Sequence, residues 1–147
     1  MASGWREQYD RMKRWHKRVQ RDRIDPDAVR DSFFAFTQAC YHLVDWLEND
    51  KSQPIRRCAA EQFVEESAIL RFCRDICNGS KHARLETKKV KMKDRSIRLD
   101  HESVVWELSV EYQDQSYTAA WFAGMCISEW NQFLREHKLL KERASSK

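Results

Sequence analysis

Five polar residues that could act on a phosphodiester fall within nine positions near the middle of the 147-residue chain: Arg74, Asp75, Asn78, Lys81 and His82. Cleavage of RNA by its own 2′-hydroxyl needs a group that exchanges a proton near pH 7 and a cation that stabilises charge on phosphorus. His82 suits the first role, because imidazole titrates in this range. Arg74 or Lys81 suits the second, and Asn78 could orient the histidine or hold a phosphate oxygen. We therefore predict Arg74 and His82 as catalytic residues, with Asp75, Asn78 and Lys81 in support.

This arrangement resembles the signature of the HEPN superfamily, helical proteins of which many are metal-independent ribonucleases. In that signature an arginine, usually followed by Asn, Asp or His, precedes a histidine by four to six residues. Arg74-Asp75 and His82 match in residue type and in their place at the end of a core helix, with seven residues between Arg74 and His82. The helix end also resembles the D-x-x-N-x-x-K-H pattern of a wider set of small bacterial proteins.

The likeness covers residues 25–82 and the last helix. It implies an endoribonuclease that needs no metal and a homodimer in which two motifs face one RNA-binding cleft. Toxin members of the family carry a tyrosine two residues beyond the histidine, which a partner nucleotidyltransferase modifies. Arg84 occupies that place, so we do not expect this mode of control.

The same residues also fit a structural role, which leaves a second interpretation open. Asp75, Asn78 and Lys81 could cap the helix end, and His82 could rest on a backbone carbonyl or an indole ring. The alternative function is a non-catalytic module that binds a nucleic acid or a protein in a bacterial stress or phage-defence complex.

Charge is distributed unevenly along the chain, whose net charge is +4. Residues 1–24 carry +5 and residues 81–98 carry +6, so the remainder carries −7. Two basic blocks on an acidic remainder favour a polyanion as partner, and we predict RNA. The residues expected to contact it are basic: Arg14, Arg18, Arg84, Lys88, Lys89, Lys91 and Lys93. The last three alternate with apolar residues and would share one face of a strand, although lysines also protect exposed edge strands from aggregation.

Glycine and proline are scarce, which favours a mostly helical chain. The sequence contains three Gly and two Pro, and neither GxGxxG nor GxxxxGK[ST] occurs, which excludes Rossmann and P-loop nucleotide sites. Asp25-Pro26 is typical of a helix start, with the helix ending near Asn49. Pro54 is expected to open the next helix and Asn78-Gly79 to close it, with glycine in a left-handed conformation.

Alternating apolar residues from Val104 to Tyr112 predict a strand, with two shorter partner strands around a turn near Asp94. The predicted fold is mainly α, a bundle of about four helices with a small antiparallel sheet inserted before the last helix. We expect a single domain over residues 1–147. Its parts are a basic N-terminal helix (1–24), a core helix pair (25–82), a small sheet (85–112) and a C-terminal helix (116–140).

Cysteine usage predicts reduced thiols in a cytoplasmic protein, because five cysteines make an odd number and residues 1–23 do not resemble a signal peptide. A zinc site begun by Cys73 and Cys77 would need further ligands: His82, with Cys40, His42 or Cys58. Core thiols are the favoured interpretation, so we expect no metal and no cofactor. The longest uncharged stretch, residues 115–128, has 14 residues and is shorter than the roughly 20 that span a bilayer, so no membrane partner is expected.

Overall fold

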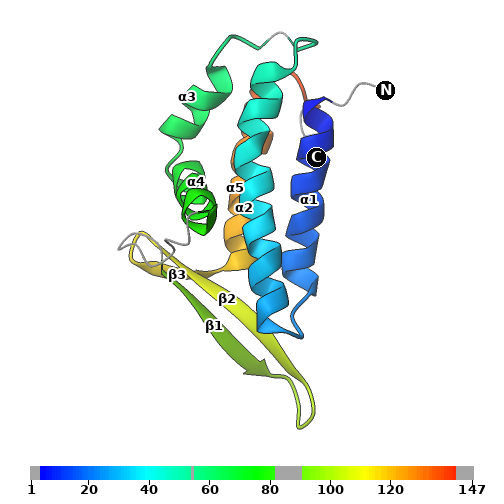
Figure 1. Cartoon of the computed structure of the whole chain (residues 1–147), viewed down its shortest axis with the longest axis vertical. Coiled ribbons are helices and arrows are strands. Elements are labelled where there is room, and N and C mark those ends of the chain that lie inside the picture. The colour runs from blue at the N-terminus through cyan, green and yellow to red at the C-terminus, as the bar shows by residue number, and fades with distance from the viewer. Residues whose placement is uncertain (1–3, 54, 82–90, 142–147) are drawn as a thin grey trace, which may run out of the picture.

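The computed structural model describes residues 4–53, 55–81 and 91–141, with residues 80 and 81 described by their backbone alone. Five helices and three strands occur in these ranges: α1 (Trp5–Arg21), α2 (Pro26–Asn49), α3 (Ala59–Glu66), α4 (Ala68–Lys81), β1 (Lys91–Arg98), β2 (Val104–Tyr112), β3 (Gln115–Thr118) and α5 (Ala119–Glu136). The fold is mainly α, with a small antiparallel sheet before the last helix, which confirms the predicted class (Figure 1). No helix in the described ranges is long and apolar enough to cross a membrane.

The helices pack around α2, the longest of them. Figure 1 shows α1 on one side of α2 and α4 on the other, with α5 behind. The predicted apolar faces are the buried ones, since Met12, Phe36, Ile76 and Trp130 each have no exposed surface. Helical periodicity therefore determines which side of each helix meets the core.

The start of α2 agrees with the predicted cap. The Asp25 carboxylate accepts a hydrogen bond from the backbone N–H of Asp27 at 2.9 Å. Pro26 occupies the first helical position, where its missing N–H costs no hydrogen bond.

The predicted helix from Pro54 to Gly79 is wrong, because the chain forms two helices in this region. The first, α3, begins only at Ala59, after Cys58 takes a left-handed conformation with φ of 66°. Ser67 is extended, with φ of −100° and ψ of 110°, and separates α3 from α4. Its hydroxyl accepts a hydrogen bond from the N–H of Leu70 at 3.3 Å, so it caps the new helix.

The expected helix end at Gly79 is also wrong. The helix α4 continues through Lys81, and no glycine among the described residues has a positive φ. The chain therefore does not turn back at this glycine.

A single strand replaces the two short strands expected around Asp94. The strand β1 pairs with β2 without interruption from Lys91↔Glu111 to Arg98↔Val104, with Asp94 opposite Leu108. The Asp94 carboxylate accepts a hydrogen bond from Arg30 of α2 at 2.9 Å. This ion pair places the aspartate on the side of the sheet that faces the helices. Because Asp94 is paired within the ladder, it does not form a turn.

The third strand, β3, was not predicted. Gln113 and Asp114 have φ of 51° and 62°, the left-handed pair typical of a two-residue hairpin turn, and they return the chain to pair with β2. Thr118 then caps α5 by accepting from the N–H of Trp121 at 3.1 Å. The last helix therefore starts at Ala119 rather than at residue 116, and it ends at Glu136.

Candidate functional site

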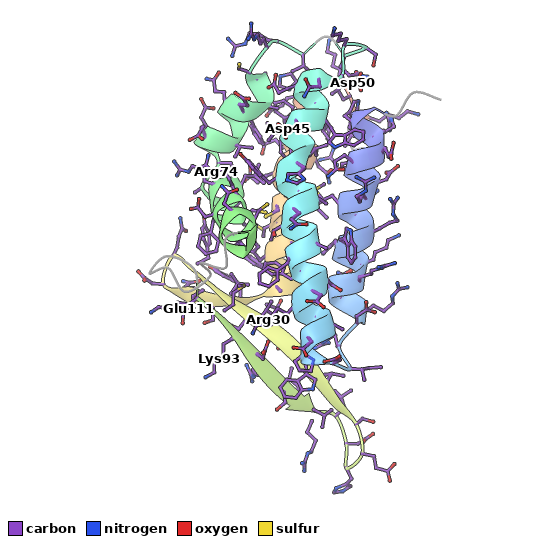
Figure 2. The ribbon with its side chains drawn as sticks, viewed as in Figure 1. Arg30, Asp45, Asp50, Arg74, Lys93 and Glu111 are labelled. Carbon is purple, nitrogen blue, oxygen red and sulfur yellow. The ribbon has the colours of Figure 1, made fainter. Side chains whose placement is uncertain are left out.

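Arg74 lies on α4, where this helix meets α3 (Figure 2). Its guanidinium forms an ion pair with the carboxylate of Glu65 on α3, and its Nε lies 3.9 Å from the Asp75 carboxylate. The Arg74 side chain is 25% exposed, while that of Glu65 is 61% exposed. The Arg74 guanidinium is thus accessible at the surface, and the Glu65 carboxylate of α3 neutralises its charge.

The other residues of the predicted catalytic group are only partly described. Asp75 and Asn78 are exposed on α4. The side chain of Lys81 and the whole of His82 lie outside the described residues. Because α4 is helical through Lys81, that residue lies about 10 Å beyond Arg74 along the helix axis.

The predicted basic strand presents Lys91 and Lys93 on its exposed face. Figure 2 shows Lys93 on the side of the sheet turned away from the helices. The ladder places Glu111 opposite Lys91 and Glu107 opposite Arg95. The Glu107 carboxylate forms its ion pair with Arg23, so Glu111 is the carboxylate that offsets part of the positive charge of this face. Arg84, Lys88 and Lys89 lie outside the described residues.

The helix α1 carries the most uniform basic surface. Arg14 and Arg18, both predicted, are exposed, as are Lys13, Lys17 and Arg21, which were not predicted. We call these five residues the α1 basic face. The sequence has no Asp or Glu from residue 11 to residue 21. Within the described part of the chain, none of the five makes an ion pair.

Their spacing explains the common face. Positions 13, 14, 17, 18 and 21 recur at helical intervals, opposite the buried side chains of Trp5, Met12 and Val19. The Arg18 guanidinium lies 4.7 Å from the centre of the Trp15 ring, a cation–π contact that orients it without neutralising its charge. The helical spacing of the cations was the signal that could have identified all five.

The α1 basic face and Arg74 do not belong to one continuous surface. They lie on α1 and α4, which flank α2 on opposite sides (Figure 1). A nucleic acid lying along α1 would therefore not lie along α4 of the same protomer.

Three buried thiols meet in the core, on helices that are distant in sequence. The sulfur atoms of Cys40 (α2), Cys73 (α4) and Cys126 (α5) all lie within 4.8 Å of one another. The zinc alternative grouped Cys73 with Cys77, but Cys77 is not a member of this group. Cys58 and His42, also considered there, lie outside it as well.

The three thiols influence each other's protonation. Burial acts to raise the pKa of Cys40, but hydrogen bonds from the side chains of Cys126, Cys73 and Trp130 outweigh burial and lower it. The hydrogen bonds to Cys126 and Cys40 raise the pKa of Cys73, and burial raises the pKa of Cys126. The indole N–H of Trp130 is buried beside Cys40.

Comparisons with known proteins assign no family to the chain. No protein-family model, no curated protein and no solved structure matches it. The HEPN resemblance therefore depends on the motif around Arg74 and His82.

Proposed function

We propose that the protein binds RNA through the α1 basic face. The observation that carries this proposal is the set of five exposed cations on α1 without an ion-paired carboxylate among the described residues. From Lys13 to Arg21 the face extends about 12 Å along the helix axis, enough to contact successive phosphates of one strand. RNA is the polyanion that the HEPN resemblance implies.

The uneven charge of the chain supports this proposal. A basic face needed only for solubility would not require the rest of the chain to be acidic, yet residues outside the two basic blocks carry −7. That polarity orients a polyanion toward α1 and repels it from the acidic remainder.

A salt titration of a fluorescent RNA tests the proposal. The variant Arg14→Ala/Lys17→Ala/Arg18→Ala removes three cations from the α1 basic face. Binding should weaken, and the slope of log K against log salt should become shallower by roughly 0.7 for each phosphate that the variant no longer neutralises. The matched control, Lys51→Ala/Arg56→Ala/Arg57→Ala, removes three exposed cations between α2 and α3 and should bind like the wild type.

Two results would contradict RNA binding by this face. One is an affinity of the wild type that does not change with salt, since phosphate contacts release counterions. The other is an equal loss of affinity in the two triple variants, which would reflect net charge alone.

Endoribonuclease activity is the second candidate. The observation that favours it is the partial exposure of the Arg74 side chain, which leaves its guanidinium accessible to a phosphate. The Arg74 guanidinium would have to exchange the Glu65 carboxylate for a phosphate, which is feasible because Glu65 is the more exposed partner. RNA incubated in EDTA should be cleaved by the wild type and left intact by His82→Ala. Glu65→Gln should increase cleavage by freeing Arg74, whereas intact RNA at high wild-type concentration would exclude the activity.

The resemblance also implies a homodimer. We further propose a cytoplasmic location, from the cysteine usage, and, in the non-catalytic alternative, a protein partner from a defence or toxin system. Sedimentation of the purified chain distinguishes a dimer from a monomer. The non-catalytic alternative predicts RNA binding that persists in His82→Ala without any cleavage by the wild type.

A further inference from the structure

The group formed by Cys40, Cys73 and Cys126 is built from three separate helices, so only the folded chain brings these thiols together. The exposed fractions of the three residues are 0%, 1% and 0%. The buried indole N–H of Trp130 lies beside Cys40 and acts on its thiol as a hydrogen-bond donor. Soft thiolate ligands that converge in this way, with a hydrogen-bond donor beside one of them, are suited to a thiophilic centre.

The sulfur separations suit an ion shared by all three thiolates. Three sulfurs placed about 2.3 Å from one centre lie about 4.0 Å apart in a trigonal plane, and somewhat closer in the trigonal pyramid that a centre with a lone pair adopts. The observed separations do not exceed 4.8 Å. The sulfurs would therefore move by less than about 1 Å, which small side-chain rotations supply.

The number of ligands narrows the choice of ion. Among the described residues, no fourth Cys, His, Asp or Glu joins the group. Structural zinc sites use four ligands, and iron–sulfur clusters use four cysteines. The group therefore favours ions that accept three sulfur ligands.

The net charge of the complex narrows the choice of bound centre further. Three thiolates around a monovalent ion carry a net charge of −2, around a divalent ion −1, and around a trivalent ion zero. Burying an uncompensated charge is strongly unfavourable, and the carboxylate of Glu129 acts on Cys126 as a further negative charge. A trivalent centre forms a neutral complex that the apolar core can accommodate.

We propose that Cys40, Cys73 and Cys126 form a three-thiolate site for a trivalent, thiophilic metalloid of the arsenite type. Arsenious acid exchanges its three As–O bonds for three As–S bonds, and the three thiol protons leave with the three hydroxyls as water. Arsenic stays in the +3 state throughout, so the step needs no oxidant or reductant. The bound arsenic would link α2, α4 and α5 covalently and thereby stabilise the helical bundle.

Titration of the full chain with arsenite, in a phosphine reductant that contains no thiol, tests this site. Native mass spectrometry should show one arsenic per chain, and the midpoint of thermal unfolding should rise. Arsenic X-ray absorption should show three sulfur neighbours. Cys126→Ala and Cys40→Ala should each weaken binding by more than roughly tenfold, because changes to the groups that merely surround metal ligands already cost about that much. Cys58→Ala, which removes an exposed thiol, should bind like the wild type.

Several results would overturn the proposal. The first is wild-type protein that keeps its fold and its unfolding midpoint unchanged at excess arsenite. The second is an arsenic coordinated by oxygen or by fewer than three sulfurs, a measurement that does not depend on how well the variants fold. The third is an equal loss of binding in Cys58→Ala. The fourth is uptake of Cu(I) or Zn(II) by a protein that does not take up arsenite.

Discussion

The carboxylate of Glu48, near the end of α2, accepts a hydrogen bond from the backbone N–H of Ala60 at 3.0 Å. It also accepts from the N–H of Cys58 at 2.9 Å. Unpaired N–H groups at a helix start require an acceptor, and a negative charge there interacts favourably with the helix dipole. Glu48 thus sets the beginning of α3, which lies after the position expected from Pro54.

Replacing Glu48 should therefore destabilise the protein. Glu48→Ala removes the acceptor from the start of α3 and should lower the free energy of unfolding by about 1–2 kcal/mol. Urea denaturation measures this change. The control Glu61→Ala removes an exposed carboxylate in the first turn of α3, and it should cost less. Equal losses would mean that overall charge, and not the cap, stabilises this helix.

Stability should fall in mildly acidic solution because of His16. Burial lowers the pKa of this imidazole, although its hydrogen bond to the Ala120 carbonyl, 3.3 Å away, partly opposes the effect. The unfolded chain, with a histidine pKa of about 6.5, binds more protons than the folded chain between the two pKa values. The contribution of His16 to the free energy of unfolding is therefore fully present above the pKa of the unfolded chain. It is lost as pH falls from that value through the lower pKa of the folded chain.

Urea denaturation between pH 7 and pH 5 tests this linkage. His16→Gln should show a smaller loss of stability over this range than the wild type does. His101→Gln, which changes an exposed histidine between β1 and β2, should retain the wild-type pH dependence. An identical dependence in wild type and His16→Gln would contradict the assignment.

Gly124→Ala should stabilise the protein. A Cβ at this position would lie 3.7 Å from Nε2 of His16, an ordinary contact, and alanine is favoured over glycine in a helix by about 1 kcal/mol. Thermal unfolding should show a higher midpoint. Ser128→Ala, at an exposed position on the same helix, should give a smaller gain, and a lower midpoint for Gly124→Ala would show that α5 and α1 are too close for a methyl group.

Arg30→Ala should loosen the β1–β2 hairpin without unfolding the bundle. Arg30 and Asp94 are each about one-third exposed, so the pair contributes less than about 1 kcal/mol to global stability. Figure 2 shows Arg30 between α2 and the sheet. Backbone amides of β1 should exchange hydrogen faster in Arg30→Ala, whereas Arg95→Ala, on the outer face of the same strand, should leave them protected. Unchanged exchange in Arg30→Ala would contradict an anchoring role.

The sequence by itself was sufficient for the helical class, the long helix from Pro26 to Asn49 and the central strand from Val104 to Tyr112. These features depend on interactions between residues close in sequence, namely apolar periodicity and the cap formed by Asp25. The exposed cations Arg14 and Arg18 could be predicted for the same reason, because the period of α1 places them opposite its buried face.

Only the tertiary structure decided where α3 begins, why β1 continues through Asp94, and which thiols meet. Glu48 acts on a helix that starts more than ten residues later, and Arg30 binds a carboxylate 64 residues away. Cys40, Cys73 and Cys126 come from three helices, and Arg74 pairs with Glu65 across the break between α3 and α4. Local periodicity carries no information about such partners, because their distance in space is set by how the helices pack and not by their separation along the chain.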